Sequence, residues 1–105
     1  MLDTVAPGIS CGEVHAAWQK VLDRYGLVKE SRIGYGIGVG YSPDWGEHTI
    51  SLRPGEGTIL QTHHSLHIIL GMWMDDWGLE LSETLHITDN GARKLCDVPW
   101  DVREV

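Results

Sequence analysis

The stretch RIGYGIGVGYSPDWGEHTISLRPG, residues 32–55, has glycine at every second position from Gly34 to Gly40. Tyr, Ile and Val stand between these glycines, which is the alternation of a β-strand with one face bare of side chains. Phosphate-binding patterns do not fit, because a P-loop separates its glycines by four residues and a dinucleotide fingerprint requires Gly-x-Gly-x-x-Gly. The stretch therefore predicts a strand over residues 33–41 that lets substrate or a neighbouring strand approach its backbone.

The composition limits the classes of partner. With 105 residues the chain is long enough for one domain, and its net charge of −7 argues against nucleic acid or an anionic membrane as partner. No apolar run approaches the roughly 18 residues that span a membrane, and the N-terminus does not resemble a signal peptide. Cys11 and Cys96 are the only cysteines, so we interpret them as free thiols and expect the chain in the reducing cytoplasm.

Residues 10–26 have the pattern of one amphipathic helix. Ser10 and Glu13 form a capping-box pattern, and Gly26 stands where a helix C-cap belongs. Cys11 falls in the first turn, where the helix N-terminus would lower its pKa, but the spacing supplies no partner histidine and we expect it to pack. The apolar positions follow 3.6-residue spacing: Val14, Ala17, Trp18, Val21, Leu22 and Tyr25.

After residue 26 the period changes to that of strands. Turn residues separate predicted strands at 33–41, 48–52, 58–61, 66–74, 78–88 and up to about 96. Residues 66–74 are mostly apolar, so we expect this strand to be covered on both faces. One helix followed by a curved, mostly antiparallel sheet over residues 33–97 makes the predicted fold class α+β, in a single domain.

Three histidines cluster before the apolar strand. His63, His64 and His67 fall within five residues, which leaves a metal site and solvated turn histidines as alternatives. On a strand His63 and His67 share a face while His64 points away, so further ligands would have to come from elsewhere. The spacing favours solvated turn histidines.

Two tryptophans flank an acidic turn. Trp73 and Trp77 enclose Asp75 and Asp76, and Glu80 follows. One interpretation is a pair of core tryptophans beside a solvated turn. The other is an aromatic wall with acids beside it, which suits a small cation.

The order of these pieces resembles a known superfamily. A capped helix, Gly-x-Gly-Ile-Gly on a strand, an Arg-Pro-Gly turn, an apolar strand ending in Gly-x-Trp and a long strand closing on Thr-x-x-Gly follow one another between Val5 and Pro99. This order resembles the C-terminal half of the pita-bread hydrolases: methionine aminopeptidase, prolidase, aminopeptidase P and creatinase. Residues 32–55 and 71–80 resemble the ectoine hydrolases in particular. The resemblance implies that residues 1–105 form a partial domain, the C-terminal portion of a pita-bread catalytic domain.

The resemblance also implies metal ligands that this chain lacks. The family's metal-binding histidine matches Tyr35, its glutamate before Pro-Gly matches Ile69, and its second glutamate ligand matches Ser82. Zinc, manganese or cobalt need imidazole or carboxylate ligands, and these three side chains supply neither. The prediction is therefore a member without a metal or other cofactor, as creatinase and ectoine hydrolase are.

For such a member the resemblance implies hydrolysis of a carbon–nitrogen bond in a small, charged compound. The specific expectation is ring opening of ectoine, in ectoine catabolism. Glu47 or His48 is expected to move a proton, although the attacking group is expected outside this chain. The predicted catalytic residues are Glu47, His48, His67 and Glu80, and the predicted substrate-binding residues are Tyr35, Trp73 and Trp77.

Two alternatives remain open: a metal-dependent Xaa-Pro dipeptidase of the same fold, and a non-enzymatic remnant or association module. The expected partner is a small molecule, a cyclic amidine or amide, with no nucleic acid and no membrane. Without the other half of the domain we expect the fragment to be inactive alone. We also expect a homo-oligomer, because open strand edges and apolar surface favour association.

Overall fold

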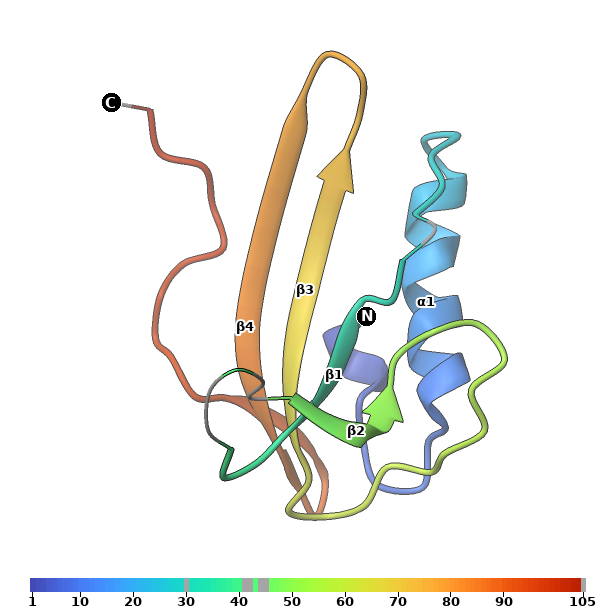
Figure 1. Cartoon of the computed structure of the whole chain (residues 1–105), viewed down its shortest axis with the longest axis vertical. Helices are drawn as coiled ribbons and strands as arrows, with labels where there is room; N and C mark the ends of the chain where they lie inside the picture. Colours follow the sequence, from blue (N-terminus) through green and yellow to red (C-terminus); the bar gives the residue numbers. More distant parts are fainter. Residues whose placement is uncertain (30, 41–42, 44–45, 105) are drawn as a thin grey trace.

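The computed structural model describes residues 1–29, 31–40, 43 and 46–104, with the side chain of Glu47 left out of that description. Its strands form one open antiparallel sheet in the order β2-β1-β3-β4-β5, beside one long helix (Figure 1). The predicted α+β class with an N-terminal helix is therefore confirmed. The elements are the 3₁₀ helix η1 (Leu2–Thr4), the helix α1 (Cys11–Asp23) and the strands β1 (Gly34–Ile37), β2 (Gly46–Ser51), β3 (Ser65–Trp73), β4 (Gly78–Thr88) and β5 (Gly91–Lys94).

The helix begins at its predicted capping box but ends at Asp23, three residues before Gly26. The Ser10 hydroxyl accepts from the Glu13 amide at 3.2 Å, and the Ser10 amide donates to the Glu13 carboxylate at 2.8 Å, which completes the capping box. Gly26 has a φ of +65°, the left-handed conformation that lets the chain turn away after the last helical turn. None of the described helices is long and apolar enough to cross a membrane.

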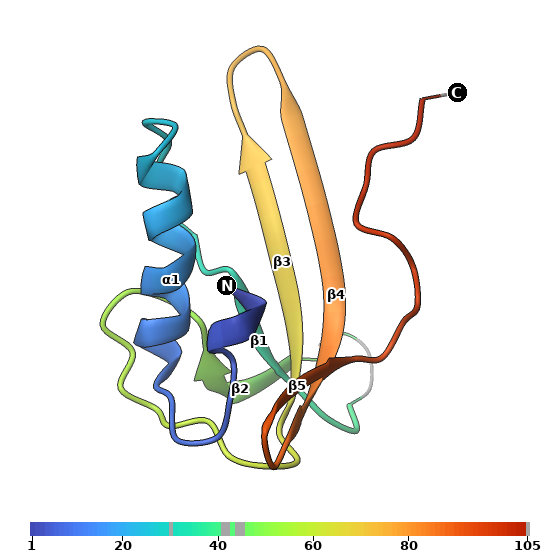
Figure 2. The same ribbon diagram turned by 180° about the vertical axis from the view of Figure 1, so that it is seen from behind.

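The sheet has a helix face and an open face. Alternation along each strand sends every second side chain to the side of α1, where the core lies. We call that side the helix face, and the opposite side, to which His67 and Ile69 belong, the open face. The 3₁₀ helix η1 lies on the helix face, in contact with α1 and β5, and Figure 2 shows it in front of the sheet. The core includes Val14 of the helix and, from the sheet, Ile33, Leu52, Leu66, Ile68, Leu85 and Ile87.

Gly34 shows what approaches the bare backbone of the glycine-rich strand. A Cβ on Gly34 would lie 2.8 Å from the His67 carbonyl oxygen and 2.9 Å from Cδ1 of Leu52. The bare position therefore admits the neighbouring strand β3 and a core leucine, as packing requires.

Three strand predictions need correction. Residues 58–61 form no strand; Ile59 makes only an isolated bridge with Ser10, because this segment pairs with the loop that leads into α1. The first strand ends at Ile37 rather than at 41. The strand β3 is not covered equally on both faces, since its buried positions alternate with half-buried ones over residues 65–70.

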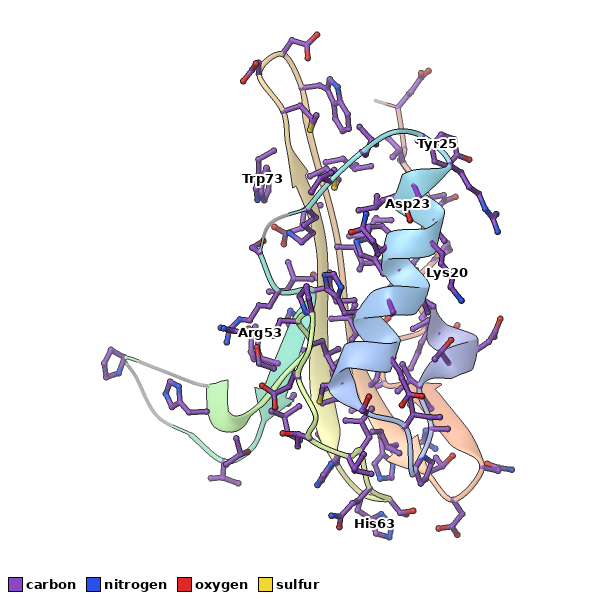
Figure 3. All side chains as sticks on the ribbon, turned by 90° about the vertical axis from the view of Figure 1, so that its right-hand side faces the viewer. Lys20, Asp23, Tyr25, Arg53, His63 and Trp73 are labelled. Atoms are coloured by element: carbon purple, nitrogen blue, oxygen red, sulfur yellow. The ribbon has the colours of Figure 1, made fainter. Side chains whose placement is uncertain are left out.

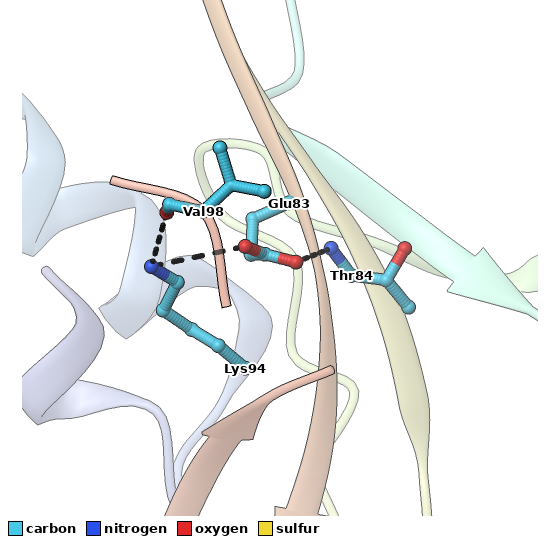
Figure 4. A network of polar contacts seen from close by, with 4 residues as sticks. All are labelled: Glu83, Thr84, Lys94 and Val98. Atoms are coloured by element: carbon cyan, nitrogen blue, oxygen red, sulfur yellow. Dashed lines mark hydrogen bonds and ion pairs between the residues drawn. The ribbon is translucent and has the colours of Figure 1, made fainter. Parts of the chain in front are cut away.

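A buried carboxylate joins the strands to the C-terminal segment (Figure 4). Glu83 is 4% exposed, and its carboxylate accepts from the Thr84 amide at 2.8 Å. The Lys94 ammonium lies 3.9 Å from the other carboxylate oxygen and donates to the Val98 carbonyl at 3.1 Å. It also lies 5.2 Å from the ring centroid of Trp100, so one cation links β4, β5 and the segment that follows.

Candidate functional site

Three side chains meet on the open face across three adjacent strands. Tyr35 of β1 pairs with His67 of β3, and His67 pairs in turn with Thr84 of β4. The Tyr35 and His67 ring centroids are 5.6 Å apart, and Nδ1 of His67 lies 3.2 Å from the Thr84 hydroxyl oxygen. A hydrogen bond to the neighbouring hydroxyl fixes the orientation of the imidazole ring. We call Tyr35, His67 and Thr84 the histidine cluster.

A cation lies over the histidine cluster. The Arg32 guanidinium carbon is 4.7 Å from the centroid of the Tyr35 ring, within the range of a cation–π contact. Tyr35 is only 8% exposed, whereas Arg32 is exposed. A cavity of about 270 Å³ opens beside the cluster, and Gly38 lines it together with all three members. The cavity can hold a small polar molecule beside an imidazole, a phenol ring and a hydroxyl.

Two of these residues, Thr84 and Arg32, were not predicted from the sequence. Thr84 could have been predicted, because a hairpin centred on Asp75 and Asp76 pairs it with His67. Arg32 carried no such signal, since it precedes β1 and is brought over Tyr35 only by the path of the chain.

The positions that the resemblance matches to metal ligands lie beside the histidine cluster. Ile69 and Ser82 pair directly across β3 and β4, two residues beyond His67 and Thr84, and Tyr35 belongs to the cluster itself. The donor set here is an alkyl group, a hydroxyl and a phenol, which does not fit a divalent metal. The described residues also include no group of three or more histidine, cysteine, aspartate or glutamate side chains able to hold one.

Trp73 and Glu80 lie at the far end of the hairpin. Figure 3 shows Trp73 on the side of β3 that faces away from α1. Its indole covers Gly71 and Gly78, since a Cβ on either glycine would lie 3.1 or 3.2 Å from it, and Glu80 pairs with Gly71. Trp73 is six residues from His67 along β3, about 20 Å. The structure therefore does not bring Trp73 together with the histidine cluster.

Trp77 stands across the turn from Trp73. Its carbonyl accepts from the Met74 amide at 2.8 Å, which closes the turn. Trp77 is 45% exposed and Trp73 is 68% exposed, so neither is a core residue. Of the two interpretations in the sequence analysis, the one with two core tryptophans is wrong.

The predicted pair Glu47 and His48 lies in β2 at the edge of the sheet. Glu47 pairs with Gly36, and its side chain falls outside the described part of the structure. His48 follows it within an irregular segment of the pairing with β1, and its side chain is exposed.

The remaining histidines do not gather around His67. Nδ1 of His63 lies 3.2 Å from Nε2 of His86, with the two rings stacked, and Nδ1 of His64 accepts from the Gln61 amide at 3.2 Å. His63 has a φ of +71°, so it stands in a tight turn.

The prediction for the pKa of Cys11 also needs correction. It is fully buried, and burial raises the pKa of its thiol where the helix N-terminus was predicted to lower it. The nearby charge of Glu56 raises that pKa further. Both cysteines are free, and Cys11 packs in the core as expected.

The fold defines the class of protein: one helix and an open five-stranded antiparallel sheet form part of a pita-bread fold. The model of metallopeptidase family M24 matches residues 1–89, and the chain belongs to this family.

Similar proteins include both hydrolases of small compounds and peptidases. The chain is 41% identical over 99 residues to ectoine hydrolase of Halomonas elongata, covering 93% of this chain and 25% of that protein. It is 36% identical over 101 residues to an uncharacterized hydrolase/peptidase, y4tM, of Sinorhizobium fredii, covering 96% of this chain and 26% of the relative. Among solved structures, the dipeptidase PepE of Mycobacterium ulcerans matches with a TM-score of 0.81 and 28% identity, covering 93% of this chain and 26% of that one. The chain thus spans about a quarter of the length of the relatives that it matches.

Proposed function

We propose that this chain forms part of the active site of a hydrolase that opens a carbon–nitrogen bond in a small compound, with ectoine as the substrate. The observation that carries the proposal is the histidine cluster, with His67 between Tyr35 and Thr84 on the open face. Similarity to an ectoine hydrolase supports the choice of substrate. In this proposal His67 transfers a proton, because an imidazole ring can act as a general acid or base through its nitrogens.

The neighbours of His67 suit the polar groups of such a substrate. Ectoine is a cyclic amidine that carries a carboxylate, and the Arg32 guanidinium over Tyr35 is the exposed cation that suits a carboxylate. Thr84 orients the His67 ring through its hydroxyl. Addition of water to the amidine carbon, cleavage of a carbon–nitrogen bond and protonation of the departing nitrogen open the ring.

The proposal needs no metal, because Tyr35, Ile69 and Ser82 stand at the matched ligand positions. Glu47, His48 and Glu80 remain proposed for a second proton transfer, and the attacking group is proposed to come from outside this chain. Trp73 and Trp77 remain proposed as an aromatic wall for a cation. Because Trp73 lies six residues from His67 along β3, a further part of the site would have to lie between them.

A second candidate function is that of a metal-dependent dipeptidase of the same fold. The match to a dipeptidase structure favours it. The side chains at the three matched ligand positions oppose it.

A titration of ectoine into the full chain, followed by NMR of the histidine and tyrosine ring protons, tests the proposal. We expect saturable shifts of the His67 and Tyr35 signals, lost in His67→Asn and kept in the matched control His64→Asn. Hydrolysis of ectoine and of an Xaa-Pro dipeptide is then followed with added Mn²⁺ and with a chelator. Dipeptide cleavage that depends on Mn²⁺, with no ectoine shifts, would support the dipeptidase and contradict our proposal.

The proposal includes a cytoplasmic location and self-association. The hairpin of β3 and β4 leaves strand edges beyond the paired residues of β1 and β5, which favours contact between copies. Light scattering at micromolar concentration measures this. A monomer at all concentrations would contradict self-association and leave the catalytic proposal standing.

A further inference from the structure

A buried lysine lies beside the end of β3 that leads to Trp73, outside the histidine cluster. Lys29 follows α1 and is 9% exposed. Its ammonium donates to the Gly71 carbonyl at 2.7 Å and to the Ser31 hydroxyl at 2.8 Å. Both acceptors are uncharged, so these contacts satisfy two of the three donors of the ammonium and leave its charge unbalanced.

Within residues 1–29, 31–40, 43 and 46–104, the carboxylates leave the charge of Lys29 unpaired. Among the described residues no carboxylate forms an ion pair with its ammonium. Burial lowers the pKa of Lys29, and the charge of Glu80, which pairs with Gly71 from β4, acts in the opposite direction. Glu80 itself is exposed, so solvent screens much of its attraction. A buried cation without a paired anion is costly, and an anionic ligand would remove that cost.

The lysine lines a cavity suited to a small molecule. The cavity measures about 480 Å³, and its walls include Ser31, Gly71, Met72 and Trp73. Trp73 supplies an exposed indole that lies against Gly71, with Cζ2 3.1 Å from the position of a Cβ there. A positive charge and an aromatic surface therefore border the same hollow.

We propose that this cavity is a binding site for a small carboxylate with a flat apolar body. The carboxylate would accept from the Lys29 ammonium and the Ser31 hydroxyl, while the body packs on the Trp73 indole. The cavity is separate from the histidine cluster, because Gly71 and His67 are four residues apart on β3, about 13 Å. It shares Trp73 with the proposed aromatic wall. Its existence does not depend on what the histidine cluster does.

The full chain is titrated with benzoate and, as the matched neutral compound, with benzamide. Binding is followed by the chemical shifts of the Trp73 indole NH. We expect benzoate to bind at least tenfold more tightly than benzamide. Lys29→Gln should reduce benzoate affinity to that of benzamide, and Lys20→Gln, which removes an exposed lysine of α1, should leave it unchanged.

Equal affinities for benzoate and benzamide in the wild-type chain would overturn the proposal, and this comparison stays decisive if Lys29→Gln does not fold. A folded Lys29→Gln that keeps full benzoate affinity would overturn it too, and would leave Lys29 as a clamp for the Gly71 carbonyl. Glu80→Gln removes a competing negative charge without touching the core. We expect it to tighten benzoate binding about two- to fivefold, and weaker binding in this variant contradicts the site.

Discussion

The two ends of the β3–β4 hairpin have the same side-chain alternation but differ in how much of the helix face is buried. At the lower end, where β1 and β5 pair with the hairpin, the helix-face residues are 0 to 1% exposed: Leu66, Ile68, Leu85 and Ile87. At the upper end, which projects beyond the rest of the sheet in Figure 1, Leu79 is 43% exposed although it belongs to the same face. Burial therefore follows from what covers a strand, and the pattern within the strand only selects the side.

The difference separates two kinds of site. The histidine cluster at the lower end is held by three paired strands, so its side chains have fixed neighbours. The cavity of Lys29 at the upper end is bordered by Trp73, whose side chain is 68% exposed. A preorganised cluster suits chemistry, because its groups need little reorganisation during the reaction.

The largest expected effect compares core positions at the two ends. Ile68→Ala should lower the free energy of unfolding by about 2–5 kcal/mol, because Ile68 is fully buried and leaves a cavity. Leu79→Ala should cost less than about 1 kcal/mol. Urea unfolding of both variants measures the difference. Similar losses would mean that the upper end is covered in solution, for instance by a second copy, and repeating the measurement at several concentrations would reveal that.

The second test compares glycines at the two ends. Gly34→Ala places a Cβ 2.8 Å from the His67 carbonyl oxygen, and since backbone of a paired strand cannot move aside, about 1–3 kcal/mol should be lost. In Gly71→Ala the nearest atom belongs to the exposed Trp73 indole, which can swing away, so stability should change by less than about 0.5 kcal/mol. Thermal unfolding checks both. A larger loss in Gly71→Ala would show that the indole is held firmly in place.

The helix offers a third comparison, since it starts near the lower end of the sheet and ends beside the upper part of the hairpin. Ser10→Ala removes the capping hydroxyl and should cost about 1 kcal/mol. Gln19→Ala removes a side-chain hydrogen bond of 2.8 Å to Asp23 on the exposed surface, worth about 0.2–0.5 kcal/mol. Urea midpoints at fixed pH measure both losses. A Ser10 variant as stable as wild type would mean that water replaces the cap.

The smallest effect concerns pH at the lower end. Burial lowers the pKa of His15, whose Nε2 has no hydrogen-bond partner among the described protein atoms. The unfolded chain takes up this proton first as the pH falls below about 6.5, so stability is present above that pH and declines below it.

His15→Gln should remove that part of the acid loss, while the exposed His48→Gln should leave it in place. Unfolding free energies between pH 7.5 and 5 provide the comparison. An unchanged slope in His15→Gln would assign the acid loss to other groups.

Local chemistry explains which predictions from sequence were correct. The capping box of Ser10 and Glu13 depends on atoms three residues apart, and the left-handed Gly26 depends on its missing Cβ. The hairpin centred on Asp75 and Asp76 is likewise local, and it fixes which residues of β3 and β4 face each other. Contacts of this kind join residues that are close in sequence, so they can be predicted from the sequence.

Segments whose partners lie far along the chain were predicted less well. Residues 58–61 were expected to join the sheet, but their amides and carbonyls bond with the loop before α1. Cys11 was expected to have a lowered pKa from its place in the first turn, but the core that surrounds it raises the pKa. In both cases the deciding neighbours are remote in sequence.

The sequence by itself determined the helix, the β3–β4 hairpin, the α+β class and the family resemblance, because periodicity, turns and caps act over a few residues. It also singled out His67 and Tyr35, which the structure brings side by side. Only the tertiary structure decided that Thr84 completes the histidine cluster and that Arg32 lies over Tyr35. It also decided that Trp73 lies about 20 Å from His67, and that the buried Lys29 borders the same cavity as the Trp73 indole. The physical reason is that strand register and the path of the chain, which arise from long-range packing, set the distances between side chains.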